Sequence, residues 1–145
     1  MNRRAFLAAT GGLSAAGLAG CFGVGGEPAG EYDVGMSSDA FLPEAYPQEG
    51  AIEVGETVIW KNTGSRTHTV TAYEGALPEG AAYFAAGGFD SEEAAREAWS
   101  SMGGERGAVE SGTTYEHTFE VPGEYRYFCI PHERTGMVGT ITVRG

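Results

Sequence analysis

The sequence predicts an all-β domain, an antiparallel sandwich or barrel that carries one short helix in a long inserted loop. Short runs of β-branched and aromatic residues recur from about residue 32 onward, and turns rich in Gly, Pro and acidic residues separate them. The chain has 145 residues, which suits one domain, or one domain plus a processed tail. Hydrophobic residues make up 41% of the chain, a typical value for a globular protein, so the sequence excludes wholesale disorder.

The first half of the domain contains four candidate strands. Residues 32–36 form an opening run, and residues 51–54 lead through a Gly-Glu turn into the run at 57–62. The run at 68–73 is β-branched and aromatic, which favours a strand. Each run has the length and the flanking turn residues of a short strand.

The second half contains three more candidate strands. Residues 115–121 alternate strictly, with Tyr115, His117, Phe119 and Val121 on one face. A Pro-Gly turn leads into the run at 125–129, and residues 137–143 close the domain. We expect His117 to be packed on its strand rather than to bind a ligand.

A long excursion between Tyr73 and Gly112 departs from the strand pattern and contains a candidate helix. Asp90 is the expected N-cap, with Glu93 three residues later to complete a capping box, and Gly103 is the expected C-terminal stop. The predicted packing residues of the helix are Ala94, Ala95, Ala98, Trp99 and Met102. We expect this helix to be structural and to carry no chemistry.

The N-terminal residues have the pattern of an export signal. Residues 1–20 begin with Arg3-Arg4 and end with the lipobox-like Leu-Ala-Gly before Cys21, which indicates a twin-arginine-type signal peptide and lipidation at Cys21. The alternative is an N-terminal helix that stays in the mature fold, with Cys21 buried. We expect a flexible tether at 21–31, a domain at 32–145, and a lipid-anchored protein on the outer face of the cytoplasmic membrane.

The charge of the chain is strongly acidic. The chain has twenty Asp and Glu residues and only nine Lys and Arg residues, which gives a formal charge of −11. Such a surface repels phosphate, so the sequence argues against nucleic acid as a partner. The acid excess also fits a protein kept soluble in concentrated salt, where screening removes most of the self-repulsion.

Three residues with metal-binding side chains stand close together near the C-terminus. Cys129, His132 and Met137 form the pattern C-x2-H-x4-M, and His68 lies upstream at the start of a candidate strand. Taken singly, the Cys or the Met would be a core residue and a loop His would be solvated. Together, two imidazoles, one thiolate and one thioether are the ligands of a blue copper site, whereas zinc has little use for a thioether.

From about residue 32 to 143 the chain resembles the plastocyanin branch of the cupredoxins, and most closely the haloarchaeal halocyanins. The strongest stretches are 123–132 and 136–141. The resemblance implies a cupredoxin-like Greek-key β-sandwich or barrel, with one copper ion. It implies the ligands His68, Cys129, His132 and Met137.

The chain departs from the family pattern directly after the first His ligand. Plastocyanins carry Asn there, and this chain has Thr69. The backbone N–H of that residue donates to the Cys sulfur in the family, a contact that Thr can keep. Whether Thr69 also replaces the side-chain bond that braces the two loops is left open by the sequence.

The predicted function is that of a mobile or membrane-tethered one-electron carrier. The resemblance implies that the ring edge of His132 is the electron port, and Gly35, Met36, Pro131 and Met137 are candidates for an apolar patch around it. Transient redox partners such as membrane respiratory complexes or oxidases would dock there. The alternative is an extracytoplasmic protein that binds and delivers copper. An enzyme is not expected, because three His residues are too few for a second metal centre.

Overall fold

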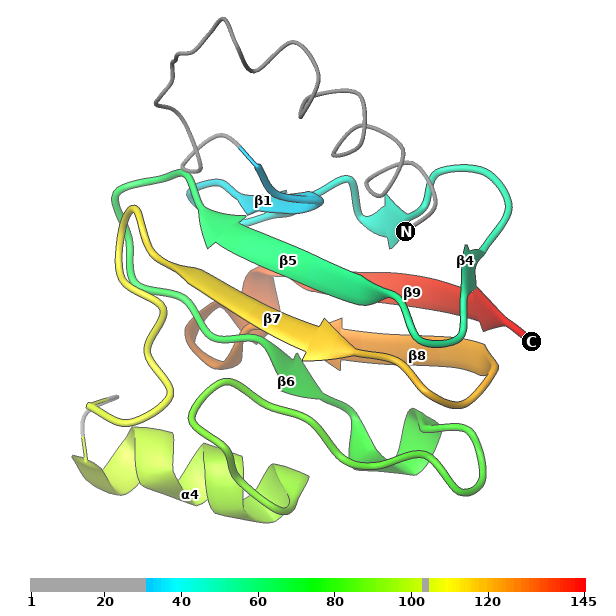
Figure 1. Ribbon diagram of the computed structural model, residues 1–145. Helices are drawn as coiled ribbons and strands as arrows, with labels where there is room; N and C mark the ends of the chain where they lie inside the picture. Colours follow the sequence, from blue (N-terminus) through cyan, green and yellow to red (C-terminus); the bar gives the residue numbers. More distant parts are fainter. Residues whose placement is uncertain (1–30, 103–104) are drawn as a thin grey trace, which may run out of the picture. The chain divides into compact units, whose positions relative to one another are not determined.

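The described part of the chain is built on two β-sheets, as the all-β prediction requires (Figure 1). The structure is a computed structural model that describes residues 31–102 and 105–145, and Asp33–Gly145 forms one compact unit. The predicted signal peptide, the lipidation site Cys21 and the tether up to residue 30 lie outside the described residues and stay predictions. Within the described ranges, no helix has the length and apolar composition needed to cross a membrane.

The first sheet has the strand order β2-β1-β5-β7, and the second has the order β3-β9-β8-β6 with β4 also paired to β9. The strands are β1 (Val34–Met36), β2 (Phe41–Leu42), β3 (Ala45–Tyr46), β4 (Ile52–Glu53), β5 (Thr57–Asn62), β6 (Thr71–Ala72), β7 (Thr114–Thr118), β8 (Gly123–Phe128) and β9 (Val138–Arg144). All seven predicted runs contain a strand. The two-residue strands β2 and β3 were not predicted, because two residues are too short to show a period.

Two predicted strands are shorter in the structure than in the sequence analysis. The run at 68–73 contributes only β6, and His68 pairs instead with Val109 in an isolated bridge. β7 ends at Thr118, because Phe119 exchanges backbone hydrogen bonds with the turn before β5: its N–H donates to Glu56 and its carbonyl accepts from Gly55. Long-range contacts therefore set these strand ends.

The strands are not all antiparallel, which corrects the sequence-based expectation. β1 runs parallel to β5, and both β3 and β4 run parallel to β9. Parallel neighbours require crossover connections rather than tight hairpins. The chain makes such connections here by crossing between the two sheets, a feature that local turn signals do not encode.

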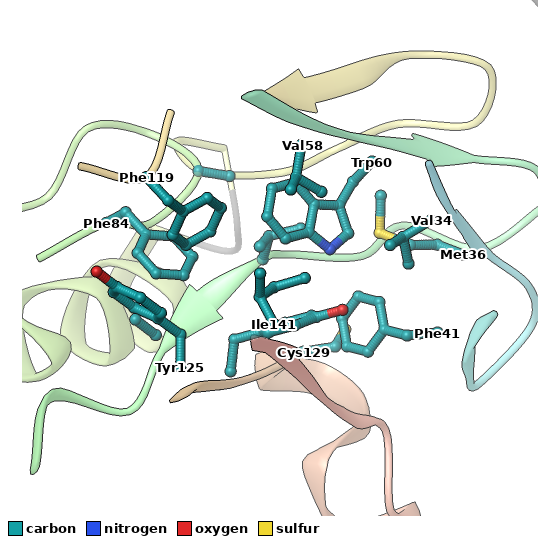
Figure 2. Close-up of a cluster of buried hydrophobic side chains, with 14 of the residues drawn as sticks. Val34, Met36, Phe41, Val58, Trp60, Phe84, Phe119, Tyr125, Cys129 and Ile141 are labelled. Atoms are coloured by element: carbon teal, nitrogen blue, oxygen red, sulfur yellow. The ribbon is translucent and has the colours of Figure 1, made fainter. Parts of the chain in front are cut away.

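Aromatic side chains fill the space between the sheets. Figure 2 shows Trp60 of β5 between the Phe84–Phe119 pair and the residues Val34 and Met36. Trp60 is fully buried, and its ring packs edge-on against Tyr127 of β8 at 5.4 Å between centroids. Tyr125, Tyr127 and Cys129 alternate along the chain and all belong to the buried core, so the last of them extends the core up to the end of β8.

The predicted helix is α4 (Glu92–Met102), which packs beside β6 (Figure 1). Its N-cap is Ser91, whose Oγ accepts a hydrogen bond from the N–H of Ala94 at 3.1 Å. The predicted capping box of Asp90 and Glu93 is therefore wrong by one residue. Ala95 and Ala98 are buried as expected, and the predicted stop at Gly103 lies outside the described residues.

Candidate metal centre

The loop between β8 and β9 carries three of the four predicted ligands. Cys129 directly follows β8, His132 lies in the 3₁₀ segment η2 (Ile130–Thr135), and Met137 directly precedes β9. The loop is closed by its own backbone: the Cys129 N–H donates to the Met137 carbonyl at 3.0 Å, and the Met137 N–H donates to the His132 carbonyl at 3.2 Å. The C-x2-H-x4-M spacing therefore corresponds to one compact turn.

The fourth predicted ligand, His68, is placed by a separate set of contacts. Its backbone N–H and carbonyl both pair with Val109, at 3.3 and 2.7 Å. The buried side chain of Asn62 organises the preceding turn: its Nδ2 donates to the carbonyls of Arg66 and Val109, and its Oδ1 accepts from the N–H of Gly64. His68 is therefore held at a fixed position after β5, although it belongs to no strand.

The structure brings His68, Cys129 and His132 together. The Cys129 Sγ lies 3.5 Å from Nδ1 of His68 and 3.4 Å from Nδ1 of His132. One ligand atom from each of the three residues lies within 4.8 Å of the others, so the group could hold a metal ion. Metal bonds to nitrogen and sulfur of about 2.0–2.3 Å let one ion reach both atoms of such a pair.

The orientation of the His68 ring is set by a backbone carbonyl. Its Nε2 lies 2.5 Å from the carbonyl oxygen of Ser37, in the loop after β1. A proton on Nε2 leaves Nδ1 as the lone-pair nitrogen, and Nδ1 is the atom that faces the sulfur. Ser37 was not recognised from the sequence, since no local pattern relates it to a residue 31 positions away.

Burial adjusts the protonation of all three groups. Burial lowers the pKa of both His68 and His132, which keeps the imidazoles neutral at pH 7. Burial raises the pKa of the Cys129 thiol to about 11. The metal-free site therefore holds a protonated thiol between two neutral imidazoles.

Met137 is fully buried and belongs to the same core cluster as Cys129. Its place at the end of the loop is compatible with a ligand role, which stays a prediction.

The predicted apolar patch around His132 is wrong in most of its members, because Gly35, Met36 and Met137 are buried and only Pro131 is exposed. His132 is half-buried, in contrast to the fully buried His68.

Thr69 makes both contacts that the sequence analysis considered. Its backbone N–H donates to the Cys129 sulfur at 3.4 Å. Its side-chain Oγ1 accepts a hydrogen bond from the N–H of Ile130 at 2.9 Å, which joins the His68 segment to η2. A hydroxyl group therefore supplies the brace between the two ligand-bearing loops.

The helix makes one contact with the ligand loop that the sequence analysis did not anticipate. Arg96 of α4 forms an ion pair with Glu133, the residue after His132, at 2.8 Å. From the sequence, only the i,i+4 pair of Arg96 with Glu92 could have been recognised.

The third histidine, His117, is packed on its strand as predicted, with its ring stacked on Phe84 at 4.4 Å between centroids.

Comparison with known proteins identifies the family. The family model described as copper binding proteins, plastocyanin/azurin family, matches residues 42–144, which include all four predicted ligands. This chain belongs to that family. Family membership makes copper the cofactor, and the donor set agrees, since a thiolate with imidazoles suits copper.

Plastocyanins are among the relatives that match this family member. The chain is 33% identical to plastocyanin of Scenedesmus fuscus over 111 residues, which cover 77% of the chain and 95% of that protein. It is 30% identical to the chloroplastic minor isoform of Arabidopsis thaliana, covering 77% of the chain. The match spans 57% of the Arabidopsis protein, so the chain covers little more than half of that relative's length.

Solved structures support the cupredoxin fold. A purple cupredoxin from Nitrosopumilus maritimus matches with a TM-score of 0.51 and 21% identity, covering 79% of this chain and all of that one. A pseudoazurin from Methylobacterium extorquens matches with a TM-score of 0.51 and 20% identity, covering 76% of this chain and 72% of that one. At such identities the similarity concerns the fold, and it confirms the predicted fold class.

Proposed function

We propose that the protein is a one-electron carrier that holds one copper ion with His68, Cys129, His132 and Met137. The observation that carries the proposal is the convergence of two imidazole nitrogens on one buried thiol within 3.5 Å. The plastocyanins among its relatives support the same role. The bound copper would supply the change of one electron.

The protein's contribution is to hold the donor atoms still. Ser37 orients the His68 ring, the Thr69 N–H donates to the sulfur, and the closed loop backbone fixes Cys129 relative to Met137. A site built this way changes little between two oxidation states, which favours rapid electron transfer. Since His132 is the least buried of the four, we assign electron exchange to its ring edge.

The cellular setting is part of the proposal. A lipid on Cys21 would tether the domain to the outer face of the cytoplasmic membrane, as in a halocyanin-like carrier. Respiratory complexes or oxidases in the same membrane are then the expected redox partners. Delivery of copper is the competing function, and the complete burial of His68, Cys129 and Met137 argues against it, because a delivery site must release its ion.

The test is the visible absorption of the copper-loaded protein. We expect an intense blue colour from the thiolate, which ascorbate bleaches and an oxidant restores. Cys129→Ser should abolish the colour, Met137→Leu should keep it and raise the potential, and the control His117→Asn should leave both unchanged. A Cys129→Ser variant that stays intensely blue contradicts the ligand assignment. Copper that a mild chelator removes readily, without reversible bleaching, would favour delivery.

A further inference from the structure

We propose that Arg96, Tyr73 and Glu133 form a clamp that positions His132 in the copper site. The clamp connects the inserted helix α4 to the ligand loop, and it joins that loop at the residue next to His132. The inference rests on the proposed function, because it takes His132 as a copper ligand. Arg96 and Tyr73 are positioning residues, since they act through Glu133.

The carboxylate of Glu133 is held on both oxygens. Arg96 Nη1 donates to Oε1 at 2.8 Å and Nη2 donates to Oε2 at 3.2 Å, which is the two-pronged geometry of a strong arginine–carboxylate pair. The Tyr73 hydroxyl donates to Oε2 at 2.7 Å. Two separate elements therefore fix one side chain of the ligand loop.

Arg96 is itself oriented from two sides. Glu92, one helical turn earlier, accepts from its Nε at 2.9 Å. Its guanidinium group also lies over the ring of Phe128, 4.3 Å from the centroid, and Tyr73 stacks on the same ring at 4.4 Å. Phe128 is fully buried and directly precedes Cys129. The clamp thus contacts the neighbours of two predicted ligands, Phe128 before Cys129 and Glu133 after His132.

His132 needs such a positioning contact more than His68 does. His68 is fully buried and its ring nitrogen meets the Ser37 carbonyl, whereas His132 is half-buried. In the described ranges, the ring nitrogens of His132 make a hydrogen-bonding contact with the Cys129 sulfur alone. Its backbone also interrupts η2, with φ −123° and ψ 15°. Short 3₁₀ turns have weak internal hydrogen bonds, so an external contact can decide where this residue sits.

The experiment compares Arg96→Gln with the matched control Arg144→Gln. The control removes a similarly short but more exposed Arg–Glu pair, Arg144 with Glu53, at the opposite end of β9. In metal-free protein the quantity to measure is hydrogen exchange at the amides of Gly136 and Met137, which donate to the carbonyls of Glu133 and His132, respectively. Arg96→Gln should speed this exchange by about threefold to tenfold, the range of a partly exposed charged contact, and the control should not.

Copper-loaded protein supplies the readout that a merely structural contact would not change. Arg96→Gln should shift the copper absorption band and the midpoint potential, and Arg144→Gln should leave both at the wild-type values. Arg96→Lys should give a band and a midpoint potential between those of the wild-type protein and Arg96→Gln, since an ammonium group cannot form the two-pronged pair with Glu133. If Arg96→Gln does not fold, Tyr73→Phe removes only the hydroxyl bond to Glu133 and should shift exchange, band and potential in the same direction.

Two results overturn the clamp. One is unchanged exchange at Gly136 and Met137 in Arg96→Gln, or in Tyr73→Phe where that variant replaces it. The other is faster exchange with an unchanged band and potential, which would make the contact a support of the loop without influence on His132. Failure of the proposed function is separate, because it appears in the wild-type protein as the lack of a reversible blue colour.

Discussion

Burial of Cys129 links copper binding to proton release. The pKa of the thiol is raised to about 11, so below that pH the thiol carries a proton that must leave when the sulfur binds a metal. Burial lowers the pKa of His68 and of His132 below the ordinary value of 6.5, so both rings are already neutral above pH 7. One proton therefore governs binding at neutral and mildly alkaline pH.

We predict that the apparent copper affinity rises about tenfold per pH unit between about pH 7 and 9, because the thiolate fraction grows tenfold per unit below its pKa. The rise should steepen at acidic pH, once the pH falls below the lowered pKa values of His68 and His132 and protonated imidazoles must also lose a proton. Competition against a chelator of known pH dependence measures it, and Cys129→Ser should lose the slope. A pH-independent affinity in the wild-type protein would contradict the prediction.

The sequence predicted the residues of the site better than their supporting contacts. Cys129, His132 and Met137 lie in one loop with a recognisable spacing, and His68 was proposed from its position at the start of an upstream candidate strand, an assignment that the family resemblance also implied. Ser37 and Arg96 could not be found in this way, because their contacts to the site join residues 31 and 37 positions apart through the fold. The burial of Met36 was also not predicted, since a Met beside a turn is compatible with both a surface position and a core position.

At the level of elements, Thr69 connects the segment that carries His68 to η2. Its hydroxyl accepts from the Ile130 N–H at 2.9 Å and also lies 3.0 Å from the hydroxyl of Thr71. Thr69 is nearly fully buried, so water cannot replace it as the acceptor. Loss of this oxygen leaves a partly buried N–H without its partner.

Thr69→Val should lower the free energy of unfolding of the metal-free protein by about 1–3 kcal/mol, the cost of an unsatisfied buried donor. Thr69→Ser keeps the oxygen and should cost less. Urea unfolding followed by tryptophan fluorescence measures both variants. Equal stability of Thr69→Val and the wild-type protein would show that the brace contributes nothing.

The bounds of β5 were predicted correctly, since the strand occupies residues 57–62. The strictly alternating run 115–121 was less well bounded, because the backbone hydrogen bonds of Phe119 end β7 at Thr118. The capping of α4 was displaced by one residue, since Asp90 and Ser91 are both good N-caps and only the fold selects Ser91. The parallel pairs on β9 were missed, because a crossover leaves no signal in the adjacent turns.

For the molecule as a whole, the formal charge of −11 opposes the compact state. The thermal unfolding midpoint should therefore rise between about 0.1 and 1 M KCl, where the screening length falls from about 10 to 3 Å. The double variant Glu93→Gln/Glu97→Gln removes two exposed charges of α4 and should show a smaller rise. Scanning calorimetry at matched pH measures both, and a midpoint that salt leaves unchanged would contradict the prediction.

The position of β9 also bears on how the protein is made. β9 pairs with β8 on one edge and with β3 and β4 on the other, so residues near 45 and 52 find their partners only among residues 140–144. A nascent polypeptide must therefore emerge from the ribosome as far as Arg144 before its second sheet can close. The loop that ends in Met137 emerges only a few residues earlier, so the metal centre and the second sheet are both completed late in the emergence of this domain.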